Sequence, residues 1–307
     1  RSSDLGTGVG KSLAYCAPAI ALALARHTRV LISTATVALQ EQLVNKDLPA
    51  LAAQMPQPFR FALAKGRGRY VCKLKLNRVA GGPDGGDDDL FEDEEPGEGF
   101  ARRTATEARV HLYADMAHAL AHASWDGDRD TLATPPEPEL WNPVAADARS
   151  CTGRHCPLFG TCTYYERRKE LVGAQVIVAN HDLLLSSLGS RQLPELDHCL
   201  LVLDNFEQVV AHAAATVGAW MDRAAQASFV VTSRERLQLA GETVYALEPM
   251  DPATEAVELF EVRARAQRAS FAPDGPQRQA VQEIARLLDG LPLALELAAA
   301  RVRVLSP

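Results

Sequence analysis

The sequence predicts an α/β protein: a parallel sheet, a cysteine-rich insert and a mostly helical C-terminal part. Three observations predict this. Short apolar runs alternate with helical segments, a glycine-rich turn leads directly into a helix, and three cysteines cluster between 151 and 162. Alternating strands and helices are typical of a parallel sheet with crossover helices. The 307 residues leave room for about two domains.

The expected elements follow from the spacing of apolar residues. Short apolar runs predict buried strands at 29–33, 174–179 and 199–203, and further strands at 59–65 and 227–232. Helical spacing predicts helices at 13–26, 36–46, 102–123, 164–171, 206–225, 253–268, 275–288 and 291–304. The Pro-rich stretch 125–150 is expected to be irregular.

The composition excludes several classes of protein. Hydrophobic residues make up 47% and charged residues 23%, which are ordinary values for a globular protein. The longest nearly apolar run, 13–25, is too short to span a membrane. No signal peptide opens the chain, so we expect a cytoplasmic protein without membrane contact. The chain starts at Arg1, only ten residues before Lys11, and we expect it to be a fragment.

Charge is unevenly distributed along the chain, although the net charge is only −7. Residues 84–98 carry nine acids and no base, and with their Gly and Pro they predict a disordered acidic loop at 81–99. Residues 60–78 carry seven bases and no acid. This basic run is either a solvated face or a nucleic-acid surface, and the sequence leaves both readings open.

The glycine-rich turn has the residues of a phosphate-binding loop. Backbone N–H groups of such a loop surround the phosphates, the Lys neutralises their charge, and the Ser hydroxyl binds Mg²⁺. We therefore expect ATP and Mg²⁺ to bind at Gly6, Thr7, Gly8, Val9, Gly10, Lys11 and Ser12. One departure is Leu5, which stands where the pattern has Gly or Ala.

A second motif lies about 190 residues further on. The apolar run 200–203 ends in Asp204. A carboxylate at the tip of a buried strand can hold the Mg²⁺ of a nucleotide opposite the phosphate loop. We expect Lys11 and Asp204 to be the catalytic residues.

Four cysteines form a candidate metal centre: Cys72, Cys151, Cys156 and Cys162. Four thiolates suit either a [4Fe–4S] cluster or a tetrahedral zinc, and the spacing alone does not decide between them. Cys16 and Cys199 lie in apolar segments and are expected to be buried and unliganded.

Together, these motifs resemble the first motor domain of DinG/XPD-type DNA helicases. The resemblance covers about 4–204 and rests on GTGVGKS (6–12), LISTATVALQEQL (31–43), KGRGRYVC (65–72), the cysteine cluster, VIVANHDLLL (176–185) and LLVLD (200–204). It implies that the four cysteines hold a [4Fe–4S] cluster. It also implies ATP hydrolysis coupled to 5′-to-3′ movement on single-stranded DNA, with 34–42 near the DNA.

The pattern changes after Asp204. Asn205 stands where the helicase family has the Glu that orients the attacking water. The segment 200–307 instead resembles the NB-ARC/STAND ATPases of AfsR- and LuxR-type bacterial regulators, through LLVLDNFEQV (200–209), FVVTSRERLQL (229–239) and DGLPLALELAAARVRVLSP (289–307). That resemblance implies that Arg234 senses the γ-phosphate and that Pro292 lies beside the adenine.

These motifs predict four segments: a phosphate-loop motor segment at 1–65, a cluster insert at 66–175, the rest of the sheet at 176–235, and an NB-ARC-like helical segment at 236–307. The leading prediction is an ATP-binding helicase motor fragment with a [4Fe–4S] cluster, acting on single-stranded DNA and incomplete as a helicase. Its hydrolysis is expected to be slow because Asn205 replaces a carboxylate. The alternatives are a STAND-type signalling ATPase with protein partners bound through the C-terminal segment, and an inactive, poorly folding fragment.

Overall fold

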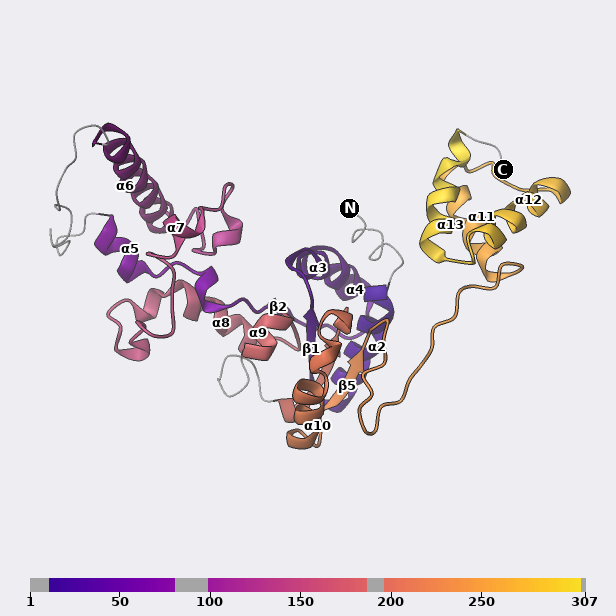
Figure 1. Ribbon diagram of the computed structural model, residues 1–307, viewed down its shortest axis with the longest axis horizontal. Coiled ribbons are helices and arrows are strands. Elements are labelled where there is room, and N and C mark those ends of the chain that lie inside the picture. The colour runs from indigo at the N-terminus through magenta and orange to yellow at the C-terminus, as the bar shows by residue number, and fades with distance from the viewer. Residues whose placement is uncertain (1–10, 81–98, 187–195, 305–307) are drawn as a thin grey trace. The chain divides into compact units, whose positions relative to one another are not determined.

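The computed structural model describes residues 11–80, 99–186 and 196–304 (Figure 1). The predicted phosphate-loop residues Gly6 to Gly10, and nearly all of the predicted acidic loop 81–99, lie outside the described residues. The described residues form two compact units. One contains 20–208 and 223–232; the other contains 1–19, 209–222 and 233–307.

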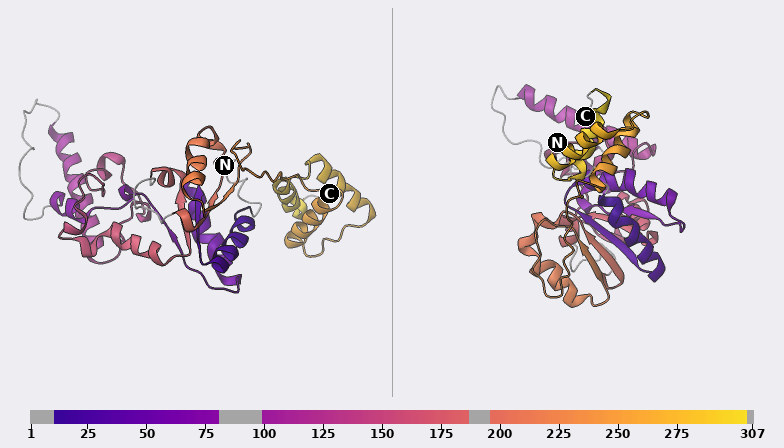
Figure 2. Two further views of the ribbon diagram at one scale, coloured as in Figure 1. Left: turned by 90° about the horizontal axis from the view of Figure 1, so that it is seen from below. Right: turned by 90° about the vertical axis from the view of Figure 1, so that its right-hand side faces the viewer.

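The first of these units holds a five-stranded parallel sheet. Its strands are β1 (Arg29–Thr34), β2 (Phe61–Leu63), β3 (Val176–Asn180), β4 (Cys199–Leu203) and β5 (Ser228–Val231). The spatial order is β2-β3-β1-β4-β5, and every neighbouring pair is parallel. Figure 2 shows the strands side by side. The predicted α/β class is thereby confirmed, and all five predicted strands are present.

The three central strands are buried, and apolar residues fill most of their positions, although Ser33 and Thr34 at the end of β1 are buried polar residues. Every residue of β4 is buried, and so are all but the first of β1 and all but the last of β3. Strands buried on both faces need such continuous apolar runs, whereas strands with one wet face alternate. This explains why these strands could be predicted from composition alone.

Helices at the start of the chain begin close to the predicted positions. Helix α2 (Lys11–Arg26) follows the predicted 13–26. The predicted helix 36–46 is longer than expected: α3 (Val37–Gln42) continues through a π-helical turn, Leu43–Asp47, into α4 (Leu48–Gln54). The apolar side of this helix stays buried at Leu43, Leu48 and Leu51, which extends it beyond the predicted end.

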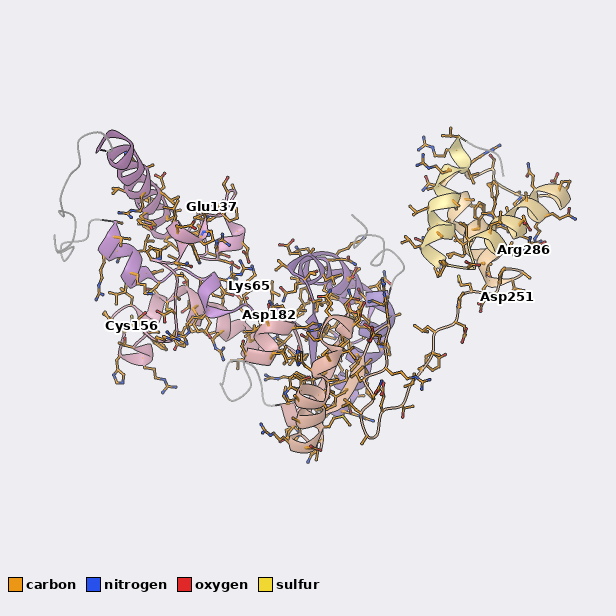
Figure 3. The ribbon with its side chains drawn as sticks, in the orientation of Figure 1. Lys65, Glu137, Cys156, Asp182, Asp251 and Arg286 are labelled. Atoms are coloured by element: carbon orange, nitrogen blue, oxygen red, sulfur yellow. The ribbon has the colours of Figure 1, made fainter. Side chains whose placement is uncertain are left out.

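In its described residues, the insert has four α-helices and several loops around its own core. The helices are α5 (Lys73–Val79), α6 (Gly99–Ala121), α7 (Pro138–Trp141) and α8 (Thr163–Gly173). The buried residues of this core cluster are Val71, Leu76, Tyr113, Met116, Trp125, Trp141, Val144 and Ala145. Figure 3 shows Lys65 and Cys156 with the side chains around them. The Pro-rich stretch 125–150, predicted to be irregular, supplies several of these core side chains.

The second unit contains a helical bundle. It consists of α11 (Glu255–Gln267), α12 (Gly275–Leu287) and α13 (Pro292–Ala299), packed around Val257, Phe260, Val281 and Leu295. Gly290 has a φ of 61°, and a Cβ there would overlap the Met250 carbonyl, so the turn before α13 requires glycine. The predicted helical character of 253–304 is confirmed.

The predicted helix 206–225 is present as a series of short helical segments rather than as one α-helix. Two 3₁₀ turns at 206–208 and 210–212 lead into a π-helical segment, Ala214–Gly218, which continues as α10 (Ala219–Arg223). Gly218 and the β-branched pair Thr216 and Val217 lower helix propensity in this stretch. No described helix is both long enough and apolar enough to cross a membrane.

Candidate functional site

Polar side chains gather at the carboxyl edge of the sheet. Ser33 and Thr34 end β1, Asp204 follows β4, and Thr232 follows β5. His181 opens α9 (His181–Ser186) directly after β3. Ligands of open parallel sheets bind at this edge, outside the carboxyl ends of the strands. The sheet therefore presents a candidate site at Asp204.

Neighbouring groups hold the Asp204 carboxylate in one orientation. Asp204 is only 1% exposed, and the Thr232 hydroxyl donates to its Oδ1 at 2.6 Å. The same hydroxyl accepts the N–H of Asn205 at 3.1 Å, while the N–H of Asp204 donates to the carbonyl of Ser33 at 2.8 Å. Because the hydroxyl accepts one bond and donates the other, Thr232 fixes both the carboxylate and the backbone after it.

His181 connects three strand ends. Its Nε2 lies 3.0 Å from the backbone carbonyl of Asp204, and its Nδ1 lies 2.7 Å from the Ser33 hydroxyl. A carbonyl only accepts, so Nε2 carries the proton and Nδ1 accepts from Ser33 in the neutral ring. Burial lowers the pKa of His181, and this effect outweighs the hydrogen bond to the Asp204 carbonyl, which raises it. The lowered pKa favours the neutral ring. Edge-on contact with the Phe206 ring, 5.8 Å away, completes its surroundings.

The remaining nucleotide-site residues lie elsewhere in the chain. Lys11 and Ser12 open α2 and belong to the second unit, and Ser12 is 5% exposed. Arg234 follows β5 by three residues, and Pro292 is the first residue of α13. The structure thus gathers Asp204 with Ser33, His181 and Thr232, three residues that the sequence did not single out. A predicted parallel sheet could have pointed to them, since each follows or ends a predicted strand.

The basic run 60–78 is partly neutralised by acids far away in the sequence. Lys65 Nζ lies 2.6 Å from Asp128 and 2.9 Å from Asp130. Arg69 also pairs with Asp130, and Lys75 pairs with Asp147. Among the described residues, three of the seven bases therefore make internal ion pairs, which neither the solvated-face nor the nucleic-acid reading of this run foresaw.

Arg67, in the same run, lies over two aromatic rings. Its guanidinium carbon is 4.4 Å from the ring centre of Tyr164 and 5.6 Å from that of Tyr165. Burial alone would lower the pKa of Arg67, but interactions with the two tyrosines and Cys151 raise it. A charge reversal at Arg67 or Arg69 would therefore disrupt contacts inside the insert, whatever its effect on DNA binding.

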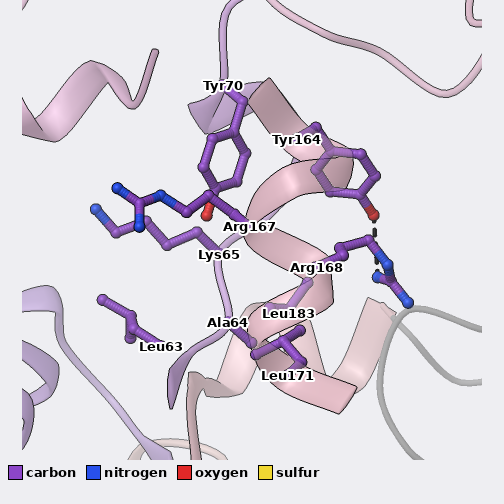
Figure 4. A pocket seen from close by; sticks show the side chains of 9 residues that line it. All are labelled: Leu63, Ala64, Lys65, Tyr70, Tyr164, Arg167, Arg168, Leu171 and Leu183. Atoms are coloured by element: carbon purple, nitrogen blue, oxygen red, sulfur yellow. Dashed lines mark hydrogen bonds between the residues drawn. The ribbon is translucent and has the colours of Figure 1, made fainter. Parts of the chain in front are cut away.

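A small hollow lies where β2, α8 and α9 meet (Figure 4). Its lining includes the aromatic rings of Tyr70 and Tyr164 and the charged groups of Lys65, Arg167 and Arg168. The Arg168 guanidinium donates to the Tyr164 hydroxyl at 3.1 Å. Tyr70 and Tyr164 are only 4% and 3% exposed, and Arg67 lies over the Tyr164 ring, so these rings pack inside the protein and offer no free face to a nucleic-acid base.

The four candidate metal-binding cysteines are half-buried free thiols. Cys72 directly precedes α5, Cys162 directly precedes α8, and Cys151 and Cys156 flank a 3₁₀ turn at Gly153–His155. The donor set fits a four-thiolate centre in its chemistry. Within the described ranges, however, no three Cys, His, Asp or Glu side chains are gathered as metal ligands. Cys16 and Cys199 are buried as predicted, and burial raises the pKa of Cys199 to about 11.

Comparison with known proteins supports one of the two predicted resemblances. The ATP-dependent DNA helicase DinG of Photobacterium profundum is 39% identical over 204 residues, which are 66% of this chain and 28% of that protein. DinG of Salmonella choleraesuis is 40% identical and DinG of Escherichia coli K12 is 37% identical, each over 200 residues, 64% of this chain and 27% of theirs. The chain thus spans little more than a quarter of the length of these relatives.

Other comparisons add little. No protein-family profile matches the chain. An XPD helicase structure superposes over 97% of this chain and 46% of its own, at 10% identity and a TM-score of only 0.32. The resemblance to DinG-type helicases is therefore confirmed for about two thirds of the chain. The resemblance of 200–307 to NB-ARC/STAND ATPases stays a prediction that these relatives do not support.

Proposed function

We propose that this chain is the nucleotide-binding part of a DinG-like, ATP-dependent DNA helicase motor. The observation that carries the proposal is the 37–40% identity to DinG helicases over 200 residues or more. The buried, oriented carboxylate of Asp204 at the carboxyl edge of a parallel sheet supports it. The proposal includes the four segments 1–65, 66–175, 176–235 and 236–307, and a cytoplasmic location.

The chain's own residues account for nucleotide binding as follows. Backbone groups of Gly6 to Gly10 surround the phosphates, and the Lys11 ammonium neutralises the charge of the β- and γ-phosphates. The Ser12 hydroxyl and the Asp204 carboxylate hold Mg²⁺. The Thr232 hydroxyl keeps that carboxylate in one orientation, and His181 donates a hydrogen bond to the backbone carbonyl of Asp204. Asn205 offers no carboxylate to polarise the attacking water, so we propose slow hydrolysis.

We propose single-stranded DNA as the partner of this motor, with 5′-to-3′ movement. The similarity to DinG-type DNA helicases supports DNA contact. Lys65 and Arg69 are tied to Asp128 and Asp130, so they hold the insert in place rather than meet phosphates.

We propose that Cys72, Cys151, Cys156 and Cys162 hold a [4Fe–4S] cluster in the insert. Bound there, the cluster would supply iron–thiolate bonds that cross-link four points of the chain. The half-buried, disulfide-free state of all four thiols supports this assignment. Zinc is the other occupant that such a thiolate set accepts.

Binding measurements test the proposal. Lys11→Ala should weaken binding of a fluorescent ATP analogue at least tenfold, because the backbone cannot neutralise the phosphates alone. Lys46→Ala, at an exposed lysine of the sheet unit, is the matched control and should bind like the wild type. Equal binding by the wild type and Lys11→Ala would show that the loop does not serve nucleotide. Anaerobically purified protein should be brown; a colourless protein with one zinc would refute the cluster.

A second candidate function is a STAND-type signalling switch. One observation favours it: Thr232, two residues before Arg234, contacts the Asp204 carboxylate, so the segment carrying the predicted sensor begins at the site. In that case Arg234→Ala should reduce discrimination between ATP and ADP, Pro292 should contact the adenine, and protein partners should bind the C-terminal segment. Binding that responds to oligonucleotide and is indifferent to Arg234 would exclude this candidate.

A further inference from the structure

Two cysteines that lie 90 residues apart in the sequence are connected through their neighbours. Thr163, which follows Cys162, donates its hydroxyl to the backbone carbonyl of Val71, which precedes Cys72, at 2.6 Å. Thr163 is 5% exposed and Val71 is fully buried. Because water does not reach this pair, replacing the hydroxyl would leave the carbonyl without that donor and without solvent in its place.

The backbone around Cys72 is fixed on both sides. The N–H of Val71 donates to the carbonyl of Gly127 at 2.9 Å, and the N–H of Cys72 donates to the carbonyl of Val144 at 2.7 Å. The carbonyl of Tyr70 accepts the N–H of Ala146 at 2.8 Å. Cys72 is therefore held by two separate segments of the insert, at 127 and at 144–146, in addition to Thr163.

Gly127 makes the close approach of Thr163 feasible. Its φ is +85°, a conformation that favours glycine, and a Cβ there would overlap the Thr163 methyl group. The Val71 side chain lies 3.2 Å from the same position. Any side chain at 127 would push Thr163 away from Val71.

Cys162 is also fixed by its position at the start of a helix. Its N–H donates to the carbonyl of Phe159 at 3.2 Å, and its carbonyl accepts the N–H of Glu166 at 2.9 Å as α8 begins.

We propose that Thr163 and Gly127 are positioning residues that hold Cys72 and Cys162 as a paired thiol site before any metal arrives. This inference rests on the proposed cluster site, because the cluster is what the paired thiols would bind. The contacts of Thr163 and Gly127 are present without a cluster. Cys151 and Cys156, beside the 3₁₀ turn, then supply the other two thiols. A site already half assembled costs less conformational entropy to complete.

Thiol pairing can be measured without iron. In the full chain carrying Cys151→Ser and Cys156→Ser, oxidised glutathione converts the two remaining site thiols into one disulfide and releases two reduced glutathione molecules. The equilibrium gives the effective concentration of Cys72 relative to Cys162, and peptide mapping identifies the bond. Cys16 and Cys199 are buried, so peptide mapping is expected to find them reduced.

In this background, Thr163→Val keeps the volume of the side chain but cannot donate, so the effective concentration should fall at least tenfold. Thr163→Ser keeps the hydroxyl and should remain within threefold of the wild type. Thr163→Ala serves as a second variant that adds no methyl group next to Val71. An unchanged effective concentration in folded Thr163→Val or Thr163→Ala would overturn the proposal. So would unfolding of the insert in both, because Thr163 would then serve the whole insert rather than the pair.

The proposed cluster has its own readout. Iron and sulfide are measured in the protein with all four cysteines, with Thr163→Val expected to lose iron to a chelator faster than Thr163→Ser. An iron-free wild type would refute the cluster yet leave the glutathione result standing. The two proposals can therefore fail separately.

Discussion

Lys65 joins the end of β2 to the insert through two acidic side chains. Its removal should lower the free energy of unfolding substantially. Lys65 Nζ lies 2.6 Å from Asp128 and 2.9 Å from Asp130, and the three side chains are 14%, 8% and 19% exposed. Lys65→Met keeps the apolar stem and removes the charge. Two carboxylates then remain with only Arg69, 3.2 Å from Asp130, to compensate them.

The expected loss of stability in Lys65→Met follows from the burial of the three side chains and from the distances between their charged atoms. At an effective dielectric constant of 20, each pair attracts by about 6 kcal/mol, most of which offsets the cost of removing the charges from water. Breaking a buried pair costs about 3–5 kcal/mol, and the residual exposure and Arg69 place Lys65→Met near the lower end, at about 3 kcal/mol. Lys169→Met removes a partner of Glu166 that is 70% exposed, and it should cost about 0.5 kcal/mol or less.

Tryptophan fluorescence during urea unfolding measures this loss. Trp125 and Trp141 lie in the core of the insert, and Trp125 donates to the backbone carbonyl of Asp128 at 2.8 Å. In a Trp220→Phe background the signal therefore reports the insert. A loss below about 1 kcal/mol for Lys65→Met would refute the reasoning.

The pH dependence of the same difference is a further check. Burial alone would lower the pKa of Lys65, but its hydrogen bonds to Asp128 and Asp130 raise it. A raised pKa means that the stabilisation is complete below the unfolded value near 10.5 and is lost only as pH rises through the higher folded value. The difference between the wild type and Lys65→Met should therefore stay constant from about pH 6 to pH 9.

Three further predictions follow from other contacts. Thr232→Val should raise the Mg²⁺ concentration for half-maximal ATP binding about tenfold, whereas Thr232→Ser should change it little; equal Mg²⁺ dependence of both would contradict the role of the hydroxyl. Burial would raise the pKa of Asp126, but bonds from the Asp128 N–H, Thr131 and Arg167 lower it, so its stabilisation is present above about pH 4 and lost as pH falls further. Asp126→Asn should flatten the acid limb of a stability–pH curve, and an unchanged limb would exclude this contribution. A thiol reagent at pH 8 should label Cys72, Cys151, Cys156 and Cys162 in chelator-treated native protein and reach Cys16 and Cys199 only after denaturation, because these two are buried; early labelling of Cys199 would contradict its burial.

The sheet could be predicted from the sequence because each of its strands contains a short apolar run. Such continuous apolar runs, VIVAN at 176–180 and CLLVL at 199–203, predict strands that are buried on both faces of a sheet. Their order could not be predicted, because β3 and β4 flank β1 although they follow it by more than 140 residues. Such long-range pairing leaves no local signal.

The site was predictable only in part, for the same reason. Asp204 stood out because it ends an apolar run, whereas Thr232 and His181 became significant only once the parallel strands brought their ends together. The ion pairs of Lys65 and Lys75 reach acids 63 and 72 residues away, so a local charge count overestimated the basic surface. The segment 206–225 is helical as predicted, but it is divided into 3₁₀, π and α segments, because Thr216, Val217 and Gly218 lower its α-helix propensity.

The central claim is that the nucleotide site of this chain serves a DNA motor. Steady-state ATP hydrolysis with and without a single-stranded oligonucleotide tests it most directly, with Lys11→Ala measuring any contaminating activity. The account predicts slow turnover that DNA stimulates several-fold in the wild type, is faster in Asn205→Glu, and is absent in Lys11→Ala. Turnover that depends on Lys11 but is the same with and without DNA, in both the wild type and Asn205→Glu, would contradict it.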